Sequence, residues 1–159
     1  MSEVEAEMVM ALERVPCSSR LLPIKGLGVV SVAGLIGEVG DFSKFRTQAE
    51  IMKLAGLDLY EVSSGKRKRQ RRITKRGRSL MRKILCFAVV QMVKKHGIMH
   101  EYYERLSGRG TLRMRALVAA MRKLLLIIHA MTRRSKQRLL AARRLRAARR
   151  ASGLQYTVR

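Results

Sequence analysis

The sequence predicts an all-helical fold, and three observations point to it. Apolar residues recur at helical spacing in several segments, strand-like alternation is weak throughout, and glycines separate the apolar segments as turns do. We expect a helix-hairpin-helix at about residues 20–40, then a basic loop with a Ser-Gly pair, then a small helical bundle ending in a basic helix or tail. With 159 residues the chain is long enough for one domain with a core.

Five segments carry the helix predictions. Residues 1–15 are acidic and helix-prone, and Val29–Val39 is a compact apolar run. Residues 47–55 open on Thr47 with Glu50 three positions later, which is the pattern of a capping box. The apolar positions of residues 78–95 are Leu80, Ile84, Leu85, Ala88 and Met92. Those of residues 112–131 are Leu112, Ala116, Ala119, Leu124 and Ile127. Turns are expected at Gly56, Gly65, Gly77 and Gly97.

The charge of the chain points to a polyanionic partner. Thirty-five Lys and Arg residues face eleven Asp and Glu residues, so the formal net charge is +24. Residues 66–83 hold eleven of these cations and residues 133–150 hold nine, with no acid in either block. Aromatic residues make up only 4% of the chain, which leaves few platforms for stacking unpaired bases. The phosphate backbone of DNA is therefore the expected target.

Other classes of protein fit the sequence poorly. Cys17 and Cys86 are far apart and form no CxxC pair, so they support neither a zinc ribbon nor a disulfide framework. His96 and His100 are four residues apart, but Gly97 lies between them and no third ligand is near, so we expect no metal site. No apolar run reaches the length of a bilayer, and we expect a cytoplasmic, nucleoid-associated protein with no membrane partner. The basic segment 133–150 leaves open the alternative of a protein bound to an anionic membrane surface.

The first candidate site is the turn before Val29–Val39. Lys25, Gly26 and Gly28 separate two apolar stretches, and the glycines let bare amides face a phosphate at a helix N-terminus. This pattern is typical of a helix-hairpin-helix, a module that grips the DNA backbone without reading its sequence. An ordinary turn between two core helices is the alternative.

The second candidate site is the Ser-Gly loop. Ser63, Ser64 and Gly65 precede a run of cations that would hold a phosphodiester and stabilise charge on its oxygens. A serine hydroxyl is a weak nucleophile without a base or a metal, and Asp58 and Glu61 are the local carboxylates. The residues alone therefore favour a basic loop with an incidental Ser-Ser-Gly turn. The candidate phosphate-binding cations are Lys66, Arg67, Lys68, Arg69, Arg71, Arg72, Lys75 and Arg78.

A series of short motifs resembles the C-terminal transposase domain of the insertion-sequence family related to the Piv DNA invertase. The resemblance covers roughly residues 18–132. Its motifs, in chain order, are Leu22-x-Ile24-x-Gly26-Leu27-Gly28, Glu38-Val39-Gly40-Asp41-Phe42-x-x-Phe45, Ala55-Gly56-Leu57, Ser63-Ser64-Gly65, Ile73-x-Lys75-x-Gly77, Leu80-x-Arg82, Tyr102-Tyr103-x-Arg105-Leu106 and Met121-Arg122-Lys123-Leu124-Leu125.

The resemblance implies a role in DNA transposition by site-specific recombination. It makes Ser64 the catalytic nucleophile, which would form a covalent phosphoserine link to a DNA end, with Ser63 as the neighbour that could be confused with it. Intact members begin with an acidic RuvC-like domain that binds a divalent metal such as Mg²⁺. We expect a fragment that binds no cofactor itself and has latent or lost catalysis.

The resemblance also implies partners and a division of the chain. DNA is the expected partner, and a guide RNA, a second copy of the chain and a separate RuvC-like domain are further candidates. We expect an acidic segment at 1–17, the transposase domain at 18–132 and a basic tail at 133–159. The alternative function is a non-enzymatic nucleic-acid-binding protein that makes no use of Ser64.

Overall fold

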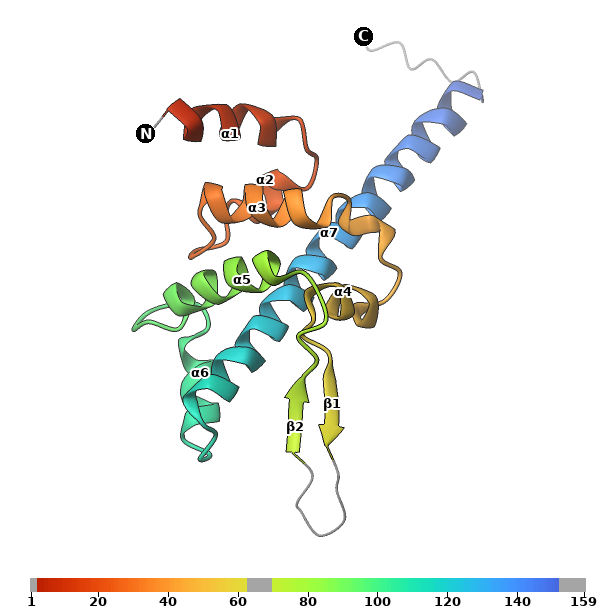
Figure 1. Ribbon diagram of the computed structural model, residues 1–159. Helices are drawn as coiled ribbons and strands as arrows, with labels where there is room; N and C mark the ends of the chain where they lie inside the picture. The colour runs from red at the N-terminus through yellow and green to blue at the C-terminus, as the bar shows by residue number, and fades with distance from the viewer. Residues whose placement is uncertain (1–2, 63–69, 152–159) are drawn as a thin grey trace.

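The computed structural model describes residues 3–62 and 70–151, and over this part of the chain the fold is mainly helical (Figure 1). The predicted helical class is therefore confirmed, and a short β-hairpin is added to it. In chain order the elements are α1 (Glu3–Glu13), α2 (Ser18–Leu21), α3 (Val29–Val39), the 3-10 helix η1 (Phe42–Lys44), α4 (Gln48–Ala55), β1 (Leu59–Val62), β2 (Gln70–Ile73), α5 (Ser79–Met92), α6 (His100–Ser107) and α7 (Arg113–Ala151).

Helix α7 is the central element of the fold. It runs obliquely past the other elements, and α2, η1, α4, α5 and α6 all pack against it (Figure 1). Its buried residues recur every three or four positions, as the stripe of a helix facing a core does. Among the side chains of α7 that the structure describes, they are Ala116, Ala120, Met121, Leu124, Leu125, Ile128, His129 and Thr132.

The predicted apolar faces of α5 and α7 are only partly right. Leu112 and Ile127 are 64% and 38% exposed, because the buried stripe of α7 begins at Ala116 and passes through Ile128 rather than Ile127. One residue further along a helix is a rotation of about 100°, so the neighbour of a buried residue can face solvent. Leu80 is 51% exposed in the first turn of α5, whereas Leu85, Ala88 and Met92 of the same prediction are buried.

Helices α1, α3 and α5 form a second packed group beside α7. Helix α3 packs against both α1 and α5, and Val32 and Leu35 are fully buried there. A Cβ on Gly34 would lie 2.7 Å from Cδ1 of Ile84, so this glycine lets α3 and α5 approach closely. Because α1 packs on α3, the predicted acidic segment 1–17 contacts the predicted domain 18–132.

The predicted capping box of α4 is confirmed. The Glu50 amide donates to Oγ1 of Thr47 at 3.3 Å, and Oε2 of Glu50 accepts from the Arg46 amide at 2.9 Å. The hydrogen bond from the Arg46 amide, together with those from Thr47, lowers the pKa of the Glu50 carboxyl despite some desolvation.

Helix α7 continues without a break through position 132, where the sequence suggests the end of the domain, to Ala151. The division into domain and tail therefore remains a prediction, and residues 152–159 lie outside the described chain. None of the helices in the described ranges has both the length and the apolar character needed to cross a membrane.

Candidate nucleic-acid interface

The predicted Ser-Gly loop lies between the two strands of an antiparallel β-hairpin. Leu59 pairs with Ile73, Tyr60 with Arg72, Glu61 with Arg71 and Val62 with Gln70. The chain therefore leaves β1 and enters β2 at neighbouring positions. The interval between the strands, residues 63–69, is outside the described residues. The predicted residues that fall in it are Ser63, Ser64, Gly65, Lys66, Arg67, Lys68 and Arg69.

Gly56 and Gly77 bring together the segment before β1 and the segment after β2, which we call the base of the hairpin. Gly56 ends α4 in the left-handed conformation with φ +64°, and a Cβ there would lie 2.8 Å from the amide nitrogen of Gly77. A Cβ on Gly77 would clash with the Gly56 nitrogen and the Leu54 carbonyl oxygen. Three backbone hydrogen bonds join the same two chain segments: Lys75 donates to Gly56 (3.0 Å), Arg78 to Leu54 (2.8 Å) and Thr74 to Asp58 (2.9 Å).

Two arginines fasten this base to the helices. Nη1 of Arg82 in α5 donates to the carbonyl oxygens of Ala55 at 3.1 Å and Gly77 at 3.0 Å. Nη1 of Arg122 in α7 donates to the carbonyl oxygen of Leu57, the residue two positions before β1. The hairpin is thus held from both of the long helices that flank it, and neither arginine was a predicted site residue.

The predicted phosphate-binding cations that the structure describes differ in their exposure and in their partners. Arg72 and Lys75 are exposed at the hairpin, and Lys75 has the unusual φ of +56°. Arg78 is 52% exposed, and its Nη1 lies 3.7 Å from Oε2 of Glu38. The Glu38 carboxylate therefore neutralises part of the Arg78 charge. Arg71 belongs to β2, where its backbone position is paired with Glu61.

The predicted turn at Lys25, Gly26 and Gly28 lies between α2 and α3. Gly28 is the N-cap of α3 and offers no side chain to its first amides. Gly26 has φ +94°, and a Cβ there would lie 2.6 Å from Cγ of Met92, so this glycine is required by the conformation and the packing of the turn. Helix α2 is a single turn of four residues. The identification of this region as a DNA-gripping helix-hairpin-helix remains a prediction.

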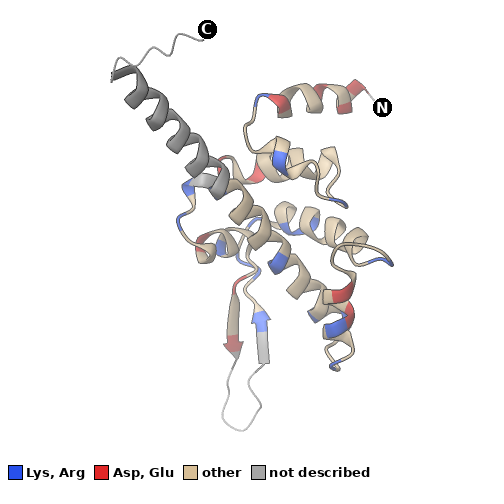
Figure 2. Ribbon diagram, turned by 180° about the vertical axis from the view of Figure 1, so that it is seen from behind, with Lys and Arg blue, Asp and Glu red and all other residues tan. Residues whose placement is uncertain are grey.

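The turn that contains Gly26 and the hairpin lie at opposite ends of α5. Gly26 contacts Met92 at its C-terminal end, whereas Gly77 and Arg78 immediately precede its N-terminal end. Fourteen residues of helix span about 20 Å, so the turn and the hairpin form separate contact points. The glutamates of α1 lie at the end of the molecule away from the hairpin (Figure 2).

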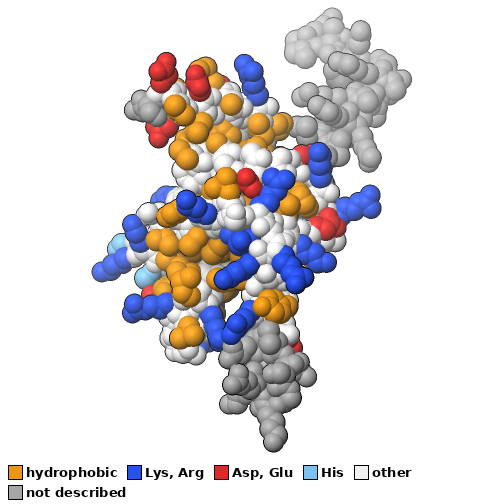
Figure 3. Space-filling view, viewed as in Figure 1, with side chains coloured by type: hydrophobic (Ala, Val, Ile, Leu, Met, Phe, Trp, Pro, Cys, Tyr) orange, Lys and Arg blue, Asp and Glu red, His pale blue; other side chains and the backbone are white. Residues whose placement is uncertain are grey.

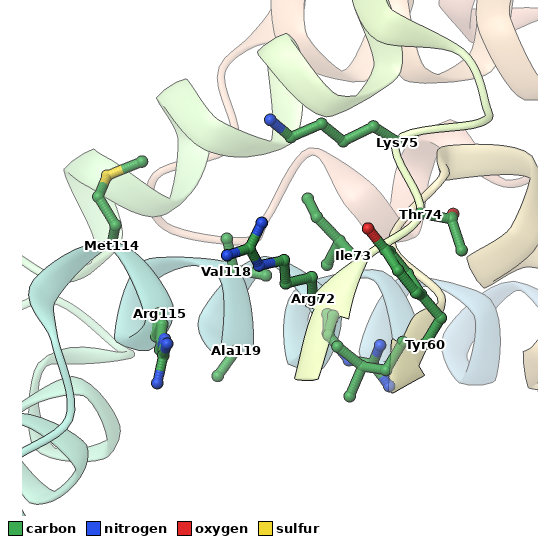
Figure 4. A pocket seen from close by; sticks show the side chains of 11 residues that line it. Tyr60, Arg72, Ile73, Thr74, Lys75, Met114, Arg115, Val118 and Ala119 are labelled. Atoms are coloured by element: carbon green, nitrogen blue, oxygen red, sulfur yellow. The ribbon is translucent and has the colours of Figure 1, made fainter. Parts of the chain in front are cut away.

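A pocket of about 610 Å³ lies between the hairpin and α7. Its basic members are Arg72 and Lys75 from the hairpin side and Arg115 and Arg122 from α7. The remaining lining residues are Leu59, Tyr60, Ile73, Thr74, Met114, Val118 and Ala119. Arg72 extends from the hairpin toward the part of α7 where Val118 lies (Figure 4). In the space-filling view, basic side chains gather where the hairpin joins the helices (Figure 3).

Sequence reasoning missed Tyr60, Thr74, Arg115 and Arg122 as pocket residues. The signal on α7 is visible afterwards: Arg115, Val118, Ala119 and Arg122 recur three to four positions apart and so share one face of the helix. Their partners on the hairpin come from residues about forty to sixty positions earlier, and no local pattern links the two.

The two predicted histidines have different surroundings. Nδ1 of His100 lies 3.0 Å from the Val93 carbonyl oxygen, to which it donates, and His96 has φ +67° in the turn before it. Within residues 3–62 and 70–151, no three or more His, Cys, Asp or Glu side chains are arranged to hold a metal ion.

Comparison with known proteins agrees with the insertion-sequence part of the resemblance. The chain is 28% identical over 130 residues to an uncharacterized 43.6 kDa protein of insertion element IS110 from Streptomyces coelicolor. The matched region is 82% of this chain and 32% of that relative, so the chain spans about a third of the relative's length. The model of the IS116/IS110/IS902 transposase family matches residues 18–104, which is more than half of the chain. The chain therefore belongs to the IS116/IS110/IS902 transposase family.

Proposed function

We propose that this chain is the DNA-holding part of an insertion-sequence transposase, in which Ser64 is the nucleophile of site-specific recombination. The observation that carries the proposal is the hairpin. Its base is fixed to α4, α5 and α7, and its strands bracket the interval that contains Ser64 and four consecutive cations. A rigid base of this kind suits a group that must meet a phosphodiester in a defined place.

Electrostatics supports DNA as the partner. The net charge of +24 would attract any nucleic acid, and the cations that follow Ser64 in the chain would hold the phosphate that the serine attacks. In the proposed step, Oγ of Ser64 bonds to phosphorus while its proton passes to water. The P–O bond to one sugar breaks, and that sugar oxygen takes a proton from water and leaves as a hydroxyl. Transfer of the DNA end to a new sugar hydroxyl then releases the serine.

The serine needs activation for this step. We propose that an acidic RuvC-like domain acts with this chain and holds the divalent metal that activates the serine and the target phosphate. The cations of the hairpin would orient the phosphodiester and offset the charge that builds on its oxygens. Without that domain, DNA binding is expected and covalent chemistry is not.

A salt series on duplex DNA tests the binding part of the proposal. If the eight predicted cations of the loop each neutralise a phosphate, log affinity falls with log salt at a slope of about −7. Replacing Lys66, Arg67, Lys68 and Arg69 by alanine should make this slope shallower by about 3.6. The matched control replaces Lys94, Lys95, Arg109 and Arg113, which changes the net charge equally, and should leave the slope nearly unchanged. Equal effects of the two variants would contradict binding at the hairpin.

A non-enzymatic nucleic-acid-binding protein is the second candidate function. The observation that favours it is that Arg72, Lys75, Arg115 and Arg122 gather at a pocket whose charge does not depend on Ser64. The two candidates differ in one outcome, because only the first predicts a covalent protein–DNA product that Ser64→Ala abolishes.

A further inference from the structure

We propose that the pocket between the hairpin and α7 binds a single unpaired nucleotide of the strand that the hairpin holds. The inference rests on the proposed function in one respect, since that function brings a nucleic acid to the hairpin. It goes further because it assigns a ligand class and a site to residues outside the predicted loop.

The charge of the pocket fits a phosphate and disfavours a cationic ligand. Four of its eleven lining residues are Arg or Lys, and none is an acid. Arg122 also holds the Leu57 carbonyl oxygen, so its guanidinium is fixed at the inner wall. Arg72, Lys75 and Arg115 are exposed, and they come from the two opposite walls. A phosphodiester entering between the walls would meet cations on both sides.

The rest of the lining fits a base or a sugar. Leu59, Ile73, Val118 and Ala119 provide apolar surface, and the hydroxyl of Thr74 adds a polar group. The volume of about 610 Å³ lies within the range of sites that take small organic ligands. A base stacked inside a perfect duplex cannot enter such a site, whereas an unpaired base can leave the stack at little cost.

Tyr60 supplies the aromatic surface that an unpaired base requires. It is 45% exposed at the pocket and is paired across the hairpin with Arg72. An exposed ring and a guanidinium that line one site are the combination that single-strand sites use, with the ring under the base and the cation on the phosphate. The pocket is also close to the predicted nucleophile in sequence, because Tyr60 precedes Ser64 by four residues. One base drawn out of the helix there would expose the adjoining phosphodiester.

The test compares two probes on the same protein. Fluorescence anisotropy of the full chain is measured with a perfect DNA duplex and with the same duplex carrying one bulged thymidine. We expect the wild type to bind the bulged probe about tenfold more tightly. Tyr60→Ala and Arg115→Glu should each remove this preference, whereas Tyr60→Phe should keep it. The matched control is Arg113→Glu, which changes an exposed arginine of the same helix outside the pocket and should keep the ratio of the two affinities. Circular dichroism melts show whether each variant is folded.

A wild type that shows no preference for the bulged probe in either DNA or RNA would overturn the inference and leave the proposed function standing. The same holds if the preference survives in both Tyr60→Ala and Arg115→Glu. Failure to bind either duplex would overturn both proposals. A parallel pair of RNA duplexes, perfect and with one bulged uridine, identifies the source of the nucleotide. A preference for the bulged probe in DNA, in RNA or in both supports the site.

Discussion

Gly56 and Gly77 lie against each other at the base of the β-hairpin, with room for a side chain on neither. A Cβ on Gly56 would lie 2.8 Å from the Gly77 nitrogen, and a Cβ on Gly77 would clash with the Gly56 nitrogen. This contact brings the end of α4 onto the start of α5. Strand β1 begins shortly after Gly56, and β2 ends shortly before Gly77. The contact between the two glycines therefore fixes where the hairpin leaves the helical core.

Replacing Gly77 by alanine should therefore destabilise the protein and displace the hairpin. The added methyl group meets backbone atoms, which cannot move aside as a flexible side chain can, so we expect a loss of about 2 kcal/mol or more in the free energy of unfolding. Urea unfolding followed by circular dichroism measures it.

The control for this substitution is Gly37→Ala in α3. A Cβ on Gly37 meets nothing within 4 Å, so alanine there should stabilise the helix by about 0.5–1 kcal/mol. If Gly77→Ala is as stable as Gly37→Ala, the two glycines do not hold the hairpin as described.

Arg82→Met tests the two hydrogen bonds by which α5 holds the base of the hairpin. The guanidinium satisfies the carbonyl oxygens of Ala55 and Gly77, and methionine fills similar space without a donor. We expect a loss of about 1–3 kcal/mol in the free energy of unfolding. Lys83→Met changes the exposed neighbour and should alter stability by less than about 0.5 kcal/mol. Similar losses for both variants would show that the guanidinium contacts contribute little.

Glu50→Gln tests the capping box of α4 through its pH dependence. The pKa of Glu50 is lowered in the folded protein, so its charge stabilises the fold above its ordinary pKa of 4.5. That stability is lost as the pH falls through the lower, folded pKa. The variant should be less stable than the wild type at pH 7, and the difference should shrink as the pH falls below 4.5. Thermal melts at a series of pH values measure it, and a difference that does not change with pH would contradict the assignment.

The local parts of the fold were predictable from the sequence because they depend on neighbouring residues. The apolar run Val29–Val39 is a helix with the predicted bounds, and Thr47 caps α4. The hairpin was not predictable in this way. Strand β2 lies inside a run of cations with no alternating pattern, and it exists because it pairs with β1.

The same distinction applies to the candidate site. Gly56 and Gly77 are recognisable as turns, but nothing local shows that they touch. The pocket joins Tyr60 and Arg72 to Arg115 and Arg122, so only the packing of the hairpin on α7 reveals it. The predicted cations are easier to identify because charge is a property of composition, and their individual roles remain predictions.

The most direct test of the central claim is whether Ser64 forms a covalent bond to DNA. The full chain, a RuvC-like domain from a full-length relative, Mg²⁺ and end-labelled element DNA are incubated together and separated on a denaturing gel. We predict a labelled protein–DNA adduct that is lost in Ser64→Ala and retained in the matched control Ser63→Ala. Loss of the adduct should leave duplex binding unchanged. An adduct that persists in Ser64→Ala, or that disappears only in Ser63→Ala, would contradict Ser64 as the nucleophile.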